Sequence, residues 1–153
     1  MKPKGAENIN IQEAGEAKQT RKQSFAPISD LRTRILILGS LPGERSLQAS
    51  EYYAHPGNRF WKIISGITGS EIPSSYDEKC SLLIANGIGL WDVVREASRE
   101  GSLDARIKHE VPNDLESFIS SRPTLSTIIF NGKTAERLFD KYFSRNGSLR
   151  YVS

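Results

Sequence analysis

The sequence has little of what disulfide bonds and metal centres need. Among 153 residues there is one cysteine, Cys80, and there are two histidines, His55 and His109. A single cysteine excludes an internal disulfide and a cysteine-ligated metal or iron–sulfur cluster, and two histidines argue against a zinc site built mainly from imidazoles. We therefore expect a cytoplasmic protein that holds no metal.

Long apolar runs are absent too. No stretch approaches the roughly 18 apolar residues of a membrane span, and the N-terminus has no apolar signal-peptide core, so we expect no membrane partner. Residues 1–24 contain hardly any large apolar side chains and cannot bury enough surface to offset the entropy of ordering, which predicts a disordered polar tail. Residues 25–153 suffice for one domain. The net charge of +3 suits a nucleic-acid partner but is shared by many proteins without one.

Short apolar runs alternate with amphipathic segments along the rest of the chain. The predicted buried strands are 34–39, 88–94 and 126–130, and the predicted helices are 59–65, 77–86, 112–121 (opened by Pro112) and 133–143. Strands and helices that alternate at this spacing predict an α/β fold, an open sheet with helices on both faces. Residues 151–153 look like the first residues of another strand, so we expect a domain truncated before or within its last strand.

Two glycine-containing loops follow the first and third predicted strands, at the carboxyl ends where open α/β sheets bind ligands. The first loop, Gly39-Ser40-Leu41-Pro42-Gly43, lets backbone approach a ligand closely, although a plain tight connection explains it equally well. A phosphate-binding loop of a nucleotide-using enzyme is a weaker alternative, because no Gly-Lys-Ser/Thr follows. Asn131-Gly132 forms the second corner.

A ten-residue stretch, residues 52–61 (Tyr-Tyr-Ala-His-Pro-Gly-Asn-Arg-Phe-Trp), is much more specific. Its tyrosines can stack on a base extruded from a duplex. Asn58 can position a water or contact a base edge, and Arg59 can contact a phosphate. Structural alternatives stay open: the last two aromatics as core of the following helix, Asn58 as its N-cap, and His55 as a side chain bonded to its own loop.

Taken together, these motifs resemble those of the uracil-DNA glycosylase superfamily. The resemblance is closest to its DNA-deoxyinosine (hypoxanthine-DNA) glycosylase branch, extends to the mismatch-specific uracil-DNA glycosylases, and covers about residues 34–143. Further matching segments are 87–93, 101–104 and 130–135. The resemblance implies a three-layer α/β/α sandwich with a short, mainly parallel central sheet. It also implies cofactor-independent hydrolysis of the N-glycosidic bond of a flipped deaminated base, hypoxanthine or uracil, in DNA.

The resemblance also implies roles for individual residues. Leu41 stands where the mismatch-specific branch has a water-orienting asparagine, and in the deoxyinosine branch an asparagine matching Asn58 takes over, so Asn58 is the expected catalytic residue. Tyr53 matches the position whose ring stacks on the flipped base. The other expected base-binding residues are Gly39, Ser40 and Leu41 through their backbone, Trp91 or Asp92, and Asn131, while His55 and Arg59 are expected to contact DNA or to order the loop.

The chain ends before one part that the resemblance implies. Superfamily members carry a Pro/Ser-rich motif after the last strand, which clamps phosphates and wedges into the duplex, and it would follow residue 153. We therefore expect a monomeric glycosylase, nucleoid-associated when bound to DNA, whose activity is impaired by truncation. The alternative is a non-catalytic binder of lesion or abasic-site DNA. Arg95, Arg99 and Arg106 lie near the turn at residues 101–102 and are expected at the surface, where they could contact DNA, although charged surface residues are more often solvated than functional.

Overall fold

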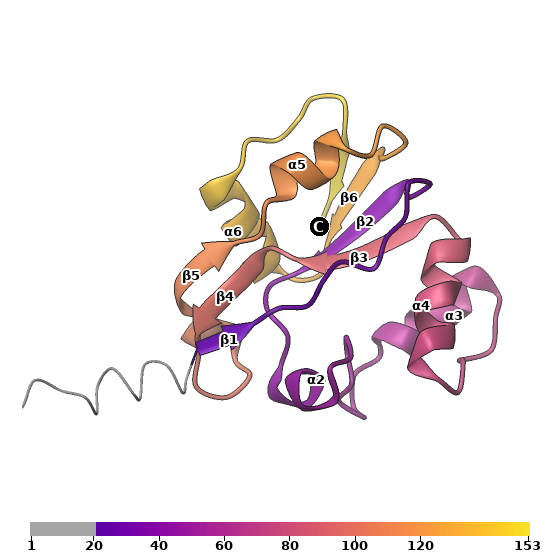
Figure 1. The fold of residues 1–153 in the computed structure, drawn as a ribbon, viewed down its shortest axis with the longest axis horizontal. Coiled ribbons are helices and arrows are strands. Elements are labelled where there is room, and N and C mark those ends of the chain that lie inside the picture. Colours follow the sequence, from indigo (N-terminus) through magenta and orange to yellow (C-terminus); the bar gives the residue numbers. More distant parts are fainter. Residues whose placement is uncertain (1–20) are drawn as a thin grey trace, which may run out of the picture.

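The computed structural model describes residues 21–153 (Figure 1). Its elements are β1 (Arg21–Gln23), β2 (Ile35–Gly39), α2 (Glu44–Ala49), α3 (Phe60–Thr68), α4 (Tyr76–Ala85), β3 (Ile88–Asp92), β4 (Val94–Ser98), the 3-10 turn η1 (Asp104–Arg106), β5 (Lys108–Pro112), α5 (Leu115–Ser120), β6 (Thr127–Phe130), α6 (Lys133–Tyr142) and β7 (Arg150–Val152). No helix within these residues is long and apolar enough to cross a membrane.

A parallel sheet in the order β3-β2-β6-β7 forms the centre of the molecule. β2, β3 and β6 lie within the three predicted strands, and each is a short apolar run whose residues are buried or half-buried on both faces of the sheet. The register pairs Gly39 with Asp92 and Leu38 with Phe130, and the amide of Asn131 donates to the Leu38 carbonyl at 2.8 Å. The carboxyl ends of β2, β3 and β6 therefore meet at one edge of the sheet.

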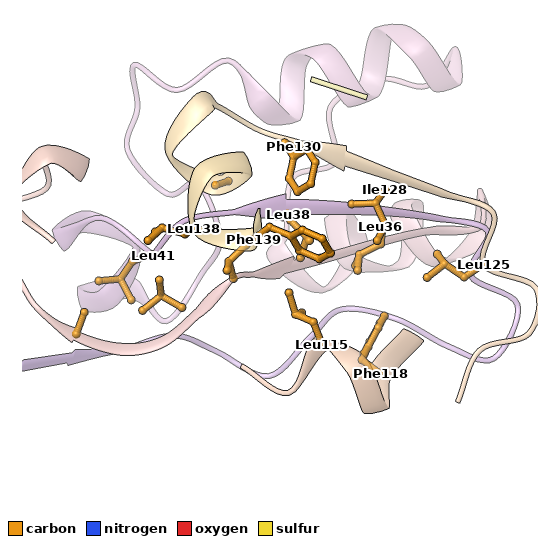
Figure 2. Packing of buried hydrophobic residues seen from close by; sticks show 14 residues of the cluster. Leu36, Leu38, Leu41, Leu115, Phe118, Leu125, Ile128, Phe130, Leu138 and Phe139 are labelled. Carbon is orange, nitrogen blue, oxygen red and sulfur yellow. The ribbon is translucent and has the colours of Figure 1, made fainter. Parts of the chain in front are cut away.

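Alternate side chains of β2 point to opposite faces of the sheet, and each face has its own helices. Leu36 and Leu38 pack with α5, α6 and the inward residues of β6, as Figure 2 shows. Ile37, on the other face, packs with residues of α3 and α4. Figure 1 shows the same division, with α3 and α4 on one side of the sheet and α5 and α6 on the other. The predicted α/β/α sandwich is confirmed.

A second, antiparallel sheet of order β1-β4-β5 was not expected from the sequence. Residues 88–94 were predicted as one strand, but the chain leaves the parallel sheet at Val93. The Val93 amide donates to the Gly39 carbonyl at 2.9 Å, and its carbonyl accepts from the Asn113 amide at 2.8 Å. The apolar run of the sequence therefore spans the end of one strand and the start of another, in different sheets.

The predicted boundary of the polar tail is wrong at residues 21–24. Residues 21–23 form β1, with Arg21 opposite Ser98, and the Ser24 amide donates to the Arg95 carbonyl at 2.8 Å. An ion pair of 2.9 Å joins Arg21 to Glu96. The strand is held by backbone pairing and polar contacts rather than by apolar burial, so its composition gave no signal. Residues 1–20, the rest of the predicted tail, lie outside the described residues.

The helix predicted at 112–121 begins later than expected. Pro112 is the last residue of β5, and Asp114 caps α5 by accepting from the Ser117 amide at 3.1 Å. An aspartate is a strong N-cap, and here it outweighs the preference of proline for the first helical turn. At the end of the chain, residues 150–152 pair with β6 in parallel as β7, where the sequence predicted the beginning of a strand.

Candidate active site

A pocket of about 310 Å³ lies at the carboxyl edge of the parallel sheet. Its lining comes from five segments: residues 39–46 after β2, the loop before α3, the end of β3, residues 102 and 104, and Asn131 after β6. The pocket thus brings together the glycine-containing loop, the aromatic stretch and the corner at Asn131. Along the sequence, the first and the last of these segments are more than 70 residues apart. Its volume lies at the lower end of the roughly 300–1,000 Å³ range of small-molecule sites.

Tyr53 forms one wall of the pocket, and two contacts hold its side chain. Its ring stacks on Phe60, with centroids 4.1 Å apart and planes at 27°, and its hydroxyl accepts from Nδ2 of Asn131 at 2.7 Å. The backbone is in the left-handed region, at φ 54°, which is costly for a bulky residue and is found mainly at functional sites. Burial, followed by the nearby Asp92 carboxyl, raises the pKa of the Tyr53 phenol, which therefore stays neutral.

The loop after β2 is held from behind by Arg99, which is only 2% exposed. Its guanidinium donates to the carbonyls of Leu41 and Pro42, and its Nε donates to the Gly101 carbonyl at 3.0 Å. The expectation of a surface position for Arg99 is therefore wrong. The side chain is a buried clamp between two loops that both line the pocket.

Gly39 is required by the close approach of its neighbours. A Cβ added there would lie 2.6 Å from Oδ1 of Asp92 and 3.1 Å from the Tyr53 hydroxyl oxygen. Next to it, Ser40 donates its hydroxyl to Oδ1 of Asp104 at 2.7 Å. Residues 39–41 line the pocket, while the side chain of Leu41 also joins the apolar core.

Asn58 lies exposed at the same pocket, and its side chain is oriented by the helix that follows. The backbone amide of Asn58 donates to the His55 carbonyl at 2.9 Å, and its side-chain Oδ1 accepts from the backbone amide of Phe60 at 2.9 Å. The N-cap position itself is Arg59, so Asn58 satisfies a helix amide from one residue further back. A carbonyl oxygen has two lone pairs, which leaves one of them able to orient a water.

Asp92 ends β3 and is 4% exposed in the pocket wall. Burial raises the pKa of its carboxyl to about 8, the Asp104 carboxylate acts in the same direction, and the Arg99 guanidinium opposes both. The geometry agrees with a raised pKa, because the Arg99 guanidinium, which faces Asp92, donates its hydrogen bonds to backbone carbonyls. Asp92 is therefore mostly protonated at neutral pH.

Comparison with known proteins places this fold and site in a family. The uracil DNA glycosylase superfamily model matches residues 26–152. The chain belongs to the uracil DNA glycosylase superfamily. It is 44% identical over 114 residues to a protein named hypoxanthine DNA glycosylase from Methanosarcina barkeri strain Fusaro, covering 74% of this chain and 72% of that relative.

Two proteins of Methanosarcina acetivorans give the same assignment. One, named hypoxanthine DNA glycosylase, is 42% identical over 115 residues, which is 74% of this chain and 73% of the relative. The other is the solution NMR structure of a candidate uracil DNA glycosylase, with a TM-score of 0.74 and 36% identity over 87% of this chain and 82% of the other. Family and relatives support a DNA repair glycosylase function for the superfamily member described here.

Most of the site residues predicted from the sequence come together in this superfamily member. The pocket contains Gly39, Ser40, Leu41, Tyr53, His55, Asn58 and Asn131. His55 also accepts from the Gly57 amide at 3.0 Å through Nδ1, which orders its own loop. Arg59 lies outside the pocket, beside Lys62 and Ile63 on α3.

Trp91 is not brought into the pocket. Its indole N–H donates to the Phe25 carbonyl at 2.8 Å, and its ring packs against Phe118 at 5.2 Å between centroids. Successive residues of a strand point to opposite faces, so Asp92, named beside it as an alternative, occupies the pocket. Tyr52, one of the two tyrosines that the sequence suggested for stacking on a base, also lines the pocket. Ser102 and Asp104 line it too and were not predicted as site residues, because the second sheet brings them in.

Proposed function

We propose that this chain hydrolyses the N-glycosidic bond of a deaminated base, hypoxanthine or uracil, that has been flipped out of DNA into this pocket. The bond between C1′ and the base nitrogen breaks, and its electron pair leaves with the base. The oxygen of a water binds C1′, and the proton that this water loses to the solvent balances the proton that the departing base takes up. The products are the free base and an abasic site in DNA.

The observation that carries the proposal is the meeting of Tyr53, Asn58 and Asn131 at one pocket of about 310 Å³. Phe60 covers one face of the Tyr53 ring, so a base can stack only on the other. Asn131 fixes the Tyr53 hydroxyl and thereby the angle of the ring. The relatives named as hypoxanthine DNA glycosylases support hypoxanthine as a substrate of this chain.

Asn58 is proposed to orient the attacking water with its side-chain oxygen. The transition state carries positive charge on the sugar and negative charge on the departing base, so a fixed dipole next to the sugar accelerates the reaction without covalent chemistry. The hydrogen bond from the Phe60 amide holds that oxygen in one position before substrate arrives. Loss of such a preorganised group costs about 10²–10³ in rate.

One observation favours a second candidate, a non-catalytic binder of lesion or abasic-site DNA. The side chain of Leu41 is 6% exposed and packs in the core, so position 41 of the loop after β2 offers no side chain that could hold water. Such a binder would prefer lesion DNA in a salt titration and release no base. The nucleotide-using alternative is disfavoured, because the carboxylates of Glu44 and Asp104 line the pocket where a phosphate would have to bind.

The expected partner is DNA that contains a deaminated base, bound by a monomer that acts in the cytoplasm with nucleoid DNA. Sedimentation velocity of the chain alone and with a lesion duplex checks this part of the proposal. One chain per lesion is the expected stoichiometry, and a dimer on a single lesion would contradict it.

A single-turnover assay on duplexes with one deoxyinosine or one deoxyuridine tests the function. Alkali cleaves any abasic product, and Asn58→Ala is expected to lose base release by at least about 10²-fold. The matched control is Ser75→Ala, which removes a helix cap of α4 that accepts from the Glu78 amide at 3.2 Å and does not line the pocket. Both variants should lose about 1 kcal/mol of stability.

Full activity in Asn58→Ala would remove Asn58 from the mechanism. No base release by the unaltered chain on either duplex, together with tight lesion binding, would establish the binder instead. An equal loss of rate in both variants would show that lost stability, rather than lost water positioning, explains the result.

A further inference from the structure

Two buried polar atoms in the pocket wall have no protein partner among residues 21–153. They are Oδ2 of Asp92 and the hydroxyl oxygen of Tyr52, whose residues are 4% and 3% exposed. Leaving a buried polar group unpaired is unfavourable, and native structures pair nearly all of them. Both residues line the same pocket, which makes a polar ligand seated there a candidate partner for both atoms.

The surroundings of Asp92 favour its neutral form. Oδ1 lies against the Cα of Gly39, too close for any side chain at that position. The Arg99 guanidinium donates its hydrogen bonds to loop carbonyls, and the carboxylate nearest to it is that of Asp104 at 3.9 Å. The titratable and charged groups that act on Asp92 or line its pocket are Glu44, Arg45, Tyr52, Tyr53, His55, Arg99 and Asp104.

We propose that Asp92 contacts the flipped base as a neutral acid, donating its O–H to a ring carbonyl while its other oxygen accepts the adjacent ring N–H, with the Tyr52 hydroxyl as a further contact. This inference rests on the proposed function and names the group that stabilises the departing base. Deamination of adenine or cytosine creates this N–H/C=O edge, because an amino group is replaced by a carbonyl and the neighbouring ring nitrogen gains a proton.

The neutral carboxyl is expected to raise the rate of base release. Negative charge develops on the base as the C1′–N bond breaks, and an O–H donor to that base binds the transition state more strongly than the ground state. The proton stays on Asp92 throughout. An ionised Asp92 would instead place a negative charge against the departing base, so the chain should lose activity when Asp92 loses its proton.

The test is the pH dependence of single-turnover base release from a deoxyinosine duplex, between pH 6 and pH 9.5. Three variants accompany the unaltered chain: Asp92→Asn, which keeps an N–H donor at every pH, Asp92→Ala, which has none, and Tyr52→Phe. The rate of the unaltered chain should fall tenfold per pH unit above about pH 8. The rate of Asp92→Asn should stay level across the same range.

The other two variants separate the two contacts. Asp92→Ala should be slower by about 10²-fold at neutral pH and should show no decline from this group at high pH. Tyr52→Phe should be slower at every pH and keep the alkaline decline. A decline that persists in Asp92→Asn would assign it to another group and overturn the proposal.

A measurement that needs no substrate keeps this result separate from failure of the proposed function. The carboxyl carbon of Asp92 can be followed by NMR in the free chain, with Asp92→Asn to assign the signal. Titration above pH 7 is the expected result, and titration below pH 5 would overturn the neutral-acid role whatever the activity. A chain that releases no base while Asp92 titrates high would refute the proposed function alone.

Discussion

Three residues of the pocket wall combine several unfavourable features of this fold. Tyr53 has a left-handed backbone, Gly39 leaves no room for a side chain, and Asp92 buries a carboxyl oxygen without a partner among the described residues. Each feature lowers stability, and all of them border the same pocket. Such a combination is typical of a binding site that is formed before its ligand arrives.

The buried carboxyl also predicts how stability depends on pH. The pKa of Asp92 in the folded chain, about 8, lies above its value of 3.8 in an unfolded chain. The folded state therefore keeps a proton that the unfolded state has released, and this group favours folding most at acidic pH. Its contribution is lost as pH rises from about 4 to about 8, with a limiting slope of about 1.4 kcal/mol per pH unit.

Asp92→Asn removes this titration and nearly keeps the shape of the side chain. In urea titrations, the free energy of unfolding of the variant minus that of the unaltered chain should increase from pH 5 to pH 8. Other carboxylates with lowered pKa values, such as Glu96 and Glu136, also make stability depend on pH. Their contributions are the same in both chains and cancel in the difference. A difference that does not change with pH would mean that Asp92 is ionised in the folded chain.

At the scale of elements, the sequence was informative wherever an element is stabilised by its own apolar pattern. The buried runs of β2 and β6 and the amphipathic helix α6 were predicted within one or two residues. The motif at residues 52–61 also located Tyr53 and Asn58 at the site. In these segments the local sequence pattern agrees with the burial in the folded chain, and this agreement makes them predictable from the sequence.

Elements that depend on distant partners were missed or misplaced. β1 is a polar segment that becomes a strand only because β4 offers an open edge. The six-residue helix α2 lacks a clear apolar face and follows a glycine N-cap with no side-chain bond. Arg99 was expected at the surface because a charged residue near a turn usually is, and only the folded loops show which carbonyls it holds.

The clamp formed by Arg99, the first residue after β4, can be tested against a residue of that strand. Arg99→Met removes the donors to the Leu41 and Pro42 carbonyls and should lower the free energy of unfolding by about 3 kcal/mol or more. Arg95→Met, at an exposed position of β4, should change it by less than about 0.5 kcal/mol. Hydrogen exchange of residues 39–43 should quicken only in the first variant. Equal effects of the two substitutions would contradict the clamp.

The whole molecule joins two sheets at the pocket. The parallel sheet supplies Gly39, Asp92 and Asn131, while the chain that leaves β4 supplies the turn at residues 101–104. β1 secures that turn, because Lys22 donates to the Gly101 carbonyl at 2.7 Å and pairs with Glu44 at 3.3 Å. The same carbonyl accepts from Arg99. The small sheet is therefore a support for the pocket rather than an appendage of the parallel sheet.

This arrangement predicts that a chain beginning at residue 25 is less stable than one beginning at residue 21. Both keep the parallel sheet, but the shorter one loses the pairing of β1 with β4, the Arg21–Glu96 ion pair and the Lys22 contacts. We expect a loss of about 1–3 kcal/mol, since a few exposed backbone and charged hydrogen bonds each contribute about 0.5–1.5 kcal/mol. Hydrogen exchange should quicken in β4 and at residues 101–104 but not in β2 or β6. Equal stability and exchange in the two chains would show that the pocket turn holds itself, and that residues 21–24 only lie along its edge.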